Sequence, residues 1–338
     1  MRCYNRIKIH ILNTNSKMKI SELSLEETEL MARVAWLHYM EGLTQREIAQ
    51  HLNLSQPKVA RLLDKAQKLG IVRFSIESPF GNCLRIEREI CKRFSLQDAM
   101  VVPCFPRSNV FEVLGKAGAW YLGRVLRDGD LVGIAWGRTL KQVALSVKNA
   151  GVKNLKFVTL VGGLTASASL NPYTIGERLA SIFDGECYYL YAPAVVENKE
   201  IRDFYLNERI NQKTLELARK ANWSLVGIGA VDARYSIYAL TGFIEYQELE
   251  LLRQQGAVGD IVGQFYDQDG RILETSLHDR TVALPLSDLR SMRNVIGIAG
   301  GSNKVPAILG ALRGSFIKIL ITDELTAQEI LNSLEKEV

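Results

Sequence analysis

The amino-acid sequence predicts an α/β fold in two parts, a small helical module at the N-terminus and a larger domain built on a largely parallel sheet. Three observations lead to this prediction: helical periodicity in the first quarter, short apolar runs alternating with helical segments after Cys83, and a basic charge excess confined to the first quarter. With 338 residues and 47% apolar content, the chain is long enough for both parts to bury a core. We expect residues 1–22 to be an N-terminal tail, residues 23–78 the helical module and residues 79–338 the larger domain.

The charge is unevenly distributed between the two parts. Residues 1–76 contain 12 Lys and Arg against 7 Asp and Glu, whereas the remainder contains 30 of each. A basic segment beside a neutral one is typical of a polyanion-binding module attached to another domain.

Two helices are predicted at the start of the module. Apolar residues recur at helical spacing between Leu30 and Met40, and Gly42 supplies a helix stop. The segment Thr44-Gln45-Arg46-Glu47 matches a capping box, in which the threonine hydroxyl and the glutamate carboxylate each satisfy a free N–H group. The second helix is therefore expected over residues 45–52.

A third helix follows after a tight turn. Asn53 tolerates the left-handed conformation, Ser55 is a good N-cap, and Pro57 in the first turn loses little because its N–H would be unpaired there. Gly70 ends the helix. Beside its apolar face runs a basic stripe of Lys58, Arg61, Lys65 and Lys68.

Two short helices joined by a three-residue turn predict a helix-turn-helix, with small Ala49 facing the crossing; the alternative is an ordinary helical hairpin. In a helix-turn-helix the second of the two lies in the major groove, with its N-terminal residues nearest the base edges. Gln56 could pair with an adenine, Lys58 and Arg61 with guanine edges or phosphates, and Lys65 with phosphates only. The predicted DNA-contacting residues are Gln45, Ser55, Gln56, Pro57, Lys58, Arg61 and Lys65.

The end of the module is predicted to be a strand. Residues 71–76 alternate apolar and polar, which is typical of a half-buried strand and would form a wing against the helices. Residues 78–82 break the pattern and mark the domain boundary.

The larger domain is expected to be Rossmann-like. A linking helix over residues 84–94, a strand over 99–102 and a helix over 113–126 are followed by further apolar runs. The candidate buried strands are residues 131–135, 157–161, 187–191, 224–228, 295–299 and 317–321. Apolar strands separated by helices predict a parallel sheet that is covered on both faces.

Glycine-bearing loops follow several of these strands, over residues 136–139, 161–165, 227–230 and 299–304. In open parallel sheets ligands bind beyond the carboxyl ends of strands, where glycine admits the backbone and helix N-termini attract anions. These loops predict a rim for a phosphate or polyhydroxy ligand, although the same glycines could serve only tight turns.

Other classes of site are not predicted. No loop matches GxGxxG or GxxxxGK[ST], and no His or Cys group has metal-ligand spacing, so we expect neither a nucleotide cofactor nor a metal and assign no catalytic residue. The five cysteines are odd in number and form no CxxC pair, which favours the reducing cytoplasm. No apolar run approaches the ~20 residues of a membrane-spanning helix, so no membrane is expected.

Taken in order, these segments resemble the sorbitol-operon regulator (SorC) family, including its phospho-autoinducer-2 sensors. The resemblance is carried by MARVAWLHYMEGLTQREIAQHLNLSQPKVARLLDKAQKLGIVRFSI and by GDLVGIAWGRTL, LVGGL, LVGIGAV, GAVGDIVGQFYD and GIAGGSNK, across residues 30–330. It implies an effector domain similar to sugar-phosphate isomerases and deaminases but used as a sensor of sugars, polyols or their phosphates.

The resemblance also implies effector-binding residues. The glycine loops would lie near a phosphate, Asp260 would accept hydroxyl hydrogen bonds, and Lys304 would engage an oxygen or a phosphate. Asp260 could instead be a turn or cap aspartate, and Lys304 could be solvated. The full predicted set is Gly137, Arg138, Thr139, Gly162, Gly163, Leu164, Asn171, Gly229, Asp260 and Lys304.

The favoured function is a transcriptional regulator of a carbohydrate or polyol operon, in which a small effector controls operator binding. Paired modules read half-sites about one helical turn apart, so a homo-oligomer is expected; the resemblance suggests tetramers, with residues 84–94 as a contact helix. One alternative is a sugar-phosphate isomerase or deaminase with Asp260 as base. Another is a sensor that acts only through protein partners.

Overall fold

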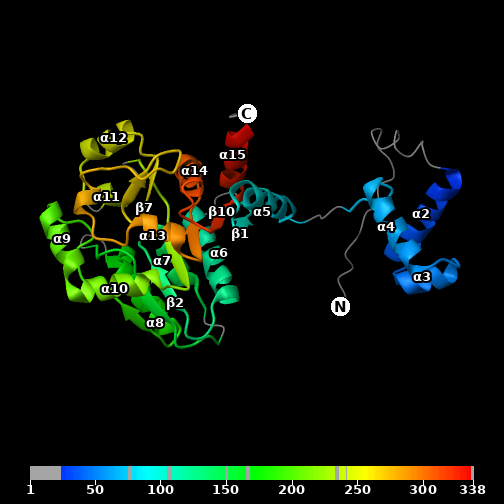
Figure 1. Cartoon of the computed structure of the whole chain (residues 1–338), viewed down its shortest axis with the longest axis horizontal. Coiled ribbons are helices and arrows are strands. Elements are labelled where there is room, and N and C mark those ends of the chain that lie inside the picture. The colour runs from blue at the N-terminus through cyan, green and yellow to red at the C-terminus, as the bar shows by residue number, and fades with distance from the viewer. Residues whose placement is uncertain are drawn as a thin grey trace. The chain divides into compact units, whose positions relative to one another are not determined.

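The computed structural model describes residues 24–74, 78, 80–104, 109–148, 151–164, 168–232, 236–240 and 242–335. The chain divides into two compact units, Met1–Ser78 and Pro79–Val338, which we describe separately (Figure 1). The predicted tail, residues 1–22, lies outside the described residues.

The N-terminal unit contains the three predicted helices, α2 (Leu25–Tyr39), α3 (Gln45–His51) and α4 (Gln56–Lys68). Their inward faces bury a small apolar cluster whose fully covered members are Met31, Val34, Ile48, Val59 and Ala66. The capping box is formed: the Glu47 N–H donates to Thr44 Oγ1 at 3.3 Å, and the Thr44 N–H donates to Glu47 Oε2 at 2.8 Å. Asn53 adopts the predicted left-handed conformation, with a φ of 51°.

The predicted wing strand is wrong for its described part. Residues 71–74 follow α4 as bends and irregular backbone, and residues 75–76 lie outside the described residues. The alternation that suggested a strand serves a different purpose, since Val72 is buried against the helices while Phe74 packs edge-on to Tyr39 at 5.1 Å between ring centres.

The C-terminal unit is built on a seven-stranded, fully parallel sheet. Its strands are β1 (Asp98–Val102), β2 (Leu131–Ile134), β3 (Lys156–Thr159), β4 (Glu186–Tyr188), β5 (Trp223–Gly227), β9 (Val295–Ile298) and β10 (Ile319–Asp323). They lie in the order β1-β10-β9-β5-β2-β3-β4. The parallel sheet was predicted, and the order from β4 to β10 is the doubly wound order of dinucleotide-binding folds with β1 added at one edge.

Helices pack along this sheet in contiguous rows (Figure 1). One row holds α6 (Val110–Val125), α7 (Arg138–Ser146) and α8 (Pro172–Ile182), and another holds α5 (Gly81–Phe94), α15 (Glu324–Glu335) and α14 (Val305–Arg313). The remaining helices are α9 (Lys199–Asn207), α10 (Arg209–Arg219), α11 (Ile237–Leu240), α12 (Tyr246–Gln254) and α13 (Leu286–Ser291). Single 3-10 turns occur at η2 (Ala168–Leu170), η3 (His278–Arg280) and η4 (Ser302–Lys304).

A second, three-stranded antiparallel sheet was not predicted. It consists of β6 (Gly229–Ala230), β7 (Gly259–Ile261) and β8 (Gln264–Tyr266). The turn between β7 and β8 has two left-handed residues, Val262 at φ 47° and Gly263 at φ 84°. Positive φ at both positions of a two-residue hairpin is typical of a type I′ turn, and it is costly for the β-branched Val262.

One edge of the parallel sheet is formed by β1, and the other by β4. The Val101 N–H donates to the Glu87 carboxylate of α5 at 2.8 Å, and the Ala99 N–H donates to the carboxylate of Asp98 at 2.9 Å. These two donors of the edge strand are therefore already paired with side-chain oxygens.

Candidate functional site

The main candidate site lies where the strand order reverses. From β2 the chain proceeds outward to β3 and β4, then returns to the other side of β2 with β5, so the loops after β2 and β5 diverge and leave a crevice. The pocket at this point has about 560 Å³ of empty space, including its open mouth. Its lining residues are Phe111, Trp136, Gly137, Arg138, Thr139, Leu140, Leu170, Gly227, Ile228, Gly229, Asp260 and Lys304.

Two charged side chains of opposite sign lie in this pocket. Burial raises the pKa of Asp260 to about 6, although Lys304 and the Gly263 N–H favour its ionised form. Burial, with Arg138 second, lowers the pKa of Lys304 to about 8, and Asp260 opposes this shift. The Lys304 ammonium donates to the Ile228 carbonyl at 2.7 Å, just beyond the end of β5.

The antiparallel sheet positions Asp260. On β6, Gly229 pairs with Asp260 of β7, and a Cβ at Gly229 would lie 1.9 Å from Asp260 Oδ1. Only glycine fits there, so Gly229 makes room for the carboxylate. The strained β7–β8 turn presents the Gly263 N–H to the same carboxylate.

The opposite wall of the pocket favours an anion. Helix α7 begins at Arg138 after Gly137, whose φ of 124° excludes ordinary side chains, and its ladder starts only with the Lys141 N–H donating to the Gly137 carbonyl. The N–H groups of the first turn therefore point beyond the helix, where they attract negative charge. The Arg138 guanidinium lies 4.6 Å from the ring centre of Phe111, which orients it at this wall.

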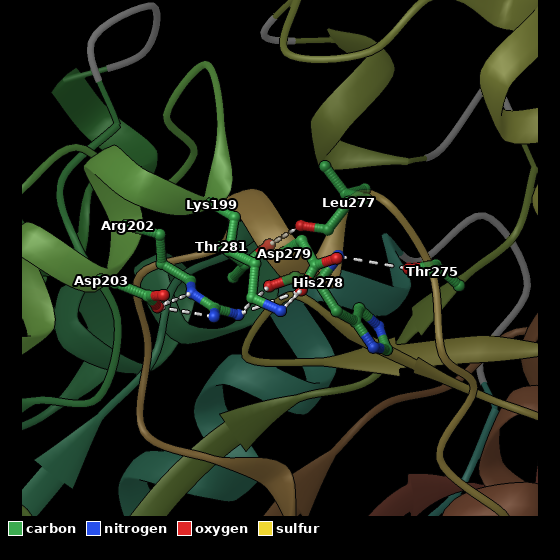
Figure 2. A network of polar contacts seen from close by, with 8 residues as sticks. All are labelled: Lys199, Arg202, Asp203, Thr275, Leu277, His278, Asp279 and Thr281. Atoms are coloured by element: carbon green, nitrogen blue, oxygen red, sulfur yellow. Dashed lines mark hydrogen bonds and ion pairs between the residues drawn. The ribbon is translucent and has the colours of Figure 1, made fainter.

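A polar network joins η3 to α9 (Figure 2), and its His278 also contacts the β7–β8 hairpin. Arg202 of α9 reaches Asp203 at 2.6 Å, the His278 carbonyl at 3.2 Å and Asp279 at 3.5 Å, fixing η3 against α9. The His278 Nε2 accepts the N–H of Phe265 in β8, and burial lowers the His278 pKa to about 4, so the ring stays neutral and keeps this acceptor.

The structure brings together part of the predicted effector set. Gly137, Arg138, Thr139, Gly229, Asp260 and Lys304 line the pocket, whereas Gly162, Gly163, Leu164 and Asn171 do not. The N–H groups of Gly162 and Gly163 donate to the Val282 and Ala192 carbonyls, respectively. Asn171 caps α8 through the Tyr173 N–H and donates to the Leu164 carbonyl. These four residues therefore connect the loop after β3 to neighbouring segments of the chain.

Sequence reasoning missed several lining residues, among them Phe111, Leu140 and Leu170. Phe111 lies in an apolar stretch of α6 and Leu170 in a single 3-10 turn, and neither position carries a motif. The carbonyl of Ile228 was missed for another reason, since backbone acceptors leave no trace in side-chain patterns.

The second candidate site is the start of α4. Ser55, Gln56, Pro57, Lys58 and Arg61 are all exposed, and Ser55 makes no side-chain capping bond, so its hydroxyl is available. Arg61 Nε donates to the Pro57 carbonyl at 3.3 Å, which holds the guanidinium along the first turn.

Two other predicted DNA-contacting residues differ from this group. Gln45 is half-buried at the first position of α3. Lys65 forms an ion pair with Glu27 of α2, and both side chains remain 41% exposed. Lys65 therefore links α4 to α2 while its outer surface still faces solvent.

Neither a metal centre nor a membrane helix is found in the part of the chain that the structure describes. Within it no three His, Cys, Asp or Glu residues group as metal ligands, and no helix is long and apolar enough to cross a bilayer.

Two family models match the chain. A sugar-binding domain model covers residues 78–332, and a winged helix-turn-helix DNA-binding model covers residues 41–73.

Curated relatives resemble the chain over nearly its whole length. The deoxyribonucleoside regulator of Bacillus subtilis is 33% identical over 91% of this chain and 99% of its own. The erythritol catabolism regulatory protein EryD of Brucella abortus is 32% identical over 90% of this chain and 97% of its own. Among solved structures, the full-length sorbitol operon regulator SorC from Klebsiella pneumoniae has a TM-score of 0.70 and 27% identity, covering 90% of this chain and 98% of that one.

Proposed function

Because this chain belongs to the SorC family of sugar-responsive transcriptional regulators, we propose that its C-terminal unit binds a small sugar phosphate or polyol and thereby controls operator binding by its helix-turn-helix. It is a DNA-binding regulator, and its helix-turn-helix and sugar-binding domain are joined in one chain. The observation that carries the effector assignment is the Asp260–Lys304 pair at the switch point of the sheet.

The chemistry of the pocket favours a ligand with hydroxyl groups at one end and an anion at the other. The Asp260 carboxylate accepts hydroxyl hydrogen bonds, while Lys304, Arg138 and the first turn of α7 attract negative charge. A ligand that satisfies these groups would offset the burial costs that shift both pKa values. Relatives are named for erythritol, sorbitol and deoxyribonucleosides, all of which are small molecules that carry hydroxyl groups.

For the remaining predicted effector residues we propose an indirect role. Gly162, Gly163, Leu164 and Asn171 shape the loop after β3, which borders the same edge of the sheet as the pocket. Their hydrogen bonds within the fold support a contribution to the shape of the rim.

For DNA recognition we propose that the exposed start of α4 enters the major groove. Gln56, Lys58 and Arg61 are placed to reach base edges or phosphates, and Ser55 and Pro57 accompany them at the helix start. Gln45, at the first turn of α3, and Lys65, farther along α4, would contact backbone phosphates. Lys65 would then exchange its bond to Glu27 for a phosphate.

We further propose that the protein acts in the cytoplasm as a homodimer or homotetramer. A single helix-turn-helix contacts few base pairs, so operators are read by paired modules. The predicted contact helix, residues 84–94, coincides with α5. Leu84 of α5 and Trp120 of α6 are 53% and 60% exposed on an apolar groove, which supports a self-association surface here.

The effector assignment is tested by thermal stability with a panel of tetritols, pentoses, hexitols and their phosphates. A panel member that binds should raise the unfolding midpoint by several degrees, because a ligand stabilises the state that binds it. Asp260→Asn and Lys304→Gln should each abolish this shift, whereas Asp269→Asn, an exposed carboxylate outside the pocket, should keep it. An undiminished shift in both pocket variants would show that the ligand binds elsewhere.

We also propose that the pocket does not catalyse. A base such as Asp260 is insufficient without a positioned acid and substrate. Measured conversion of any stabilising sugar phosphate, lost in Asp260→Asn, would instead establish the isomerase or deaminase alternative. If the protein did not prefer its own upstream DNA over random duplex, action through protein partners would be favoured.

A further inference from the structure

Helix α15 lies between the effector pocket and the helix that follows the DNA-binding unit. In Figure 1, α15 and α5 lie side by side in the C-terminal unit, and α15 also contacts η4, the turn that carries Lys304. Its buried face is formed by Thr326, Ala327, Ile330 and Leu331, so it is a packed element and not a loose terminus.

On one side, α15 is joined to η4 by hydrogen bonds. The Gly301 N–H donates to Asp323 Oδ2 at 3.0 Å and to Thr326 Oγ1 at 2.7 Å. The Ser302 hydroxyl donates to Glu329 Oε1 at 2.7 Å, one turn farther along α15. Gly301, Ser302 and Lys304 belong to one short segment, so a shift of the η4 backbone would also shift these bonds.

Asp323 organises this junction. Its carboxylate accepts the Thr326 N–H at 3.0 Å and the Thr326 hydroxyl at 2.6 Å, which caps the start of α15. A Cβ at Gly300 would lie 2.1 Å from Asp323 Oδ2, so the loop after β9 passes directly against the carboxylate. One buried side chain therefore holds both the helix start and the loop that leads to Lys304.

On the other side, α15 is joined to the start of α5. Asn82 Nδ2 donates to Glu324 Oε1 at 2.6 Å, and Arg85 Nη2 donates to Gln328 Oε1 at 3.4 Å and to Asn82 Oδ1 at 3.0 Å. These bonds lie in the first turns of α5, which begins at Gly81, three residues after the N-terminal unit ends at Ser78.

From this arrangement we propose that α15 couples the effector pocket to the DNA-binding unit, with Asp323 as the positioning residue at the pocket side and Asn82 and Arg85 as the contacts at the other. The inference rests on the proposed function for its biological role, but the mechanical coupling is a property of the chain alone. The Lys304 ammonium binds the Ile228 carbonyl, and a ligand that recruits this ammonium shifts η4, then the start of α15, then the first turns of α5.

Hydrogen–deuterium exchange on the full chain tests the coupling without an effector. Lys304→Ala removes the bond to Ile228 and should speed amide exchange several-fold both at residues 324–328 and at residues 81–88. Arg253→Ala is the matched control, because it removes an exposed ion pair to Glu250 within α12. Exchange at residues 81–88 that stays at the wild-type rate in Lys304→Ala would overturn the inference.

A second set of variants separates coupling from simple loosening. In the Asn82→Ala/Arg85→Ala background, Lys304→Ala should still speed exchange at residues 324–328 but should no longer affect residues 81–88. If it changes residues 81–88 as strongly as in the wild-type background, the path does not run through this contact. In the Asp323→Asn background, Lys304→Ala should speed amide exchange at residues 324–328 by less than it does in the wild-type background. An equal increase in both backgrounds would show that Asp323 is not part of the path.

The same variants connect the coupling to function. With erythritol 4-phosphate, ribose 5-phosphate and sorbitol 6-phosphate as probes, an active probe should change the Kd for upstream DNA by roughly five- to 150-fold in the wild type. In the Asn82→Ala/Arg85→Ala variant, the probe should change the Kd for upstream DNA by less than about threefold. The affinity of the variant for the probe should stay within about twofold of the wild-type affinity. A change in this Kd as large as in the wild type contradicts the inference. No response to any probe in the wild type, with exchange coupling intact, contradicts the proposed effector class and leaves the coupling supported.

Discussion

At the scale of single residues, the pocket keeps two charged groups in an environment that disfavours both charges. Folding raises the pKa of Asp260 to about 6, above the value of about 3.9 in an unfolded chain. The folded state therefore binds more protons between these values, and the contribution of Asp260 to stability is lost as the pH rises from about 4 to 6. The ligand-free pocket is thus least favourable at neutral pH, where the effector would be recognised.

This leads to a prediction on pH dependence. Relative to the wild type, Asp260→Asn should gain stability between pH 4 and pH 7, by on the order of 2 kcal/mol, because only the wild type has a carboxylate to ionise. The measurement is the free energy of unfolding in urea at each pH for both proteins. A constant difference across this range would show that Asp260 ionises freely in the folded state.

A second prediction at this scale concerns the recognition helix. Lys58→Ala and Arg61→Ala should each weaken operator binding, and the double variant should reduce the slope of log K against log salt by up to about 2, roughly 0.9 for each phosphate that is no longer neutralised. Fluorescence anisotropy with the upstream fragment at several salt concentrations measures this. Lys213→Ala, an exposed lysine of α10, controls for net charge and should leave the slope unchanged. Equal slopes for all the variants would displace the DNA-binding surface from the start of α4.

At the scale of elements, the turn between α3 and α4 gives a test with two outcomes at one position. Asn53 is exposed and left-handed, so Asn53→Gly should keep the module's stability, whereas Asn53→Ala should cost about 1 kcal/mol. The thermal unfolding midpoint of the N-terminal unit distinguishes the two variants. It is monitored as the loss of operator binding during heating. If Asn53→Ala were as stable as the wild type, the left-handed turn would carry no constraint.

The same scale shows which elements a sequence predicts. Strands β2, β5, β9 and β10 are buried on both faces and appear as continuous apolar runs, and the capping box and Asn53 specify α3 and its turn locally. Strands β6 to β8 have only two or three residues each and are too short for periodicity to detect. The prediction of a wing strand was wrong because the alternation of residues 71–74 reflects packing against the helices. Among the described residues these four have no partner strand.

The candidate pocket was also predicted only in part: residues with a local sequence signal were found, and residues placed only by packing were missed. Gly137 and Lys304 follow strands of the large sheet, and the doubly wound strand order brings them to one crevice, whereas Asp260 reaches it from β7 of the small antiparallel sheet. Phe111 and Leu170 join them only through the packing of α6 and η2, which no local pattern specifies. Gly162 and Gly163 carry the same glycine signal as Gly137, but their backbone groups bind neighbouring loops.

At the scale of the whole molecule, the prediction concerns self-association. Leu84→Glu and Trp120→Glu should each lower the oligomeric state, because they place a charge on the apolar groove between α5 and α6. Analytical ultracentrifugation over a range of concentrations measures the shift. Leu251→Glu on α12, at a site 57% exposed, is the control and should leave assembly unchanged. Wild-type assembly in both groove variants would place the interface elsewhere.

The pairing of Val101 and Ala99 with carboxylates at the rim of the large sheet has a consequence for how copies meet. A bare margin would recruit further strands and allow open-ended polymers, but here the donors are already occupied. At this edge the addition of another strand is therefore disfavoured, and a contact between copies there would form mainly through side chains.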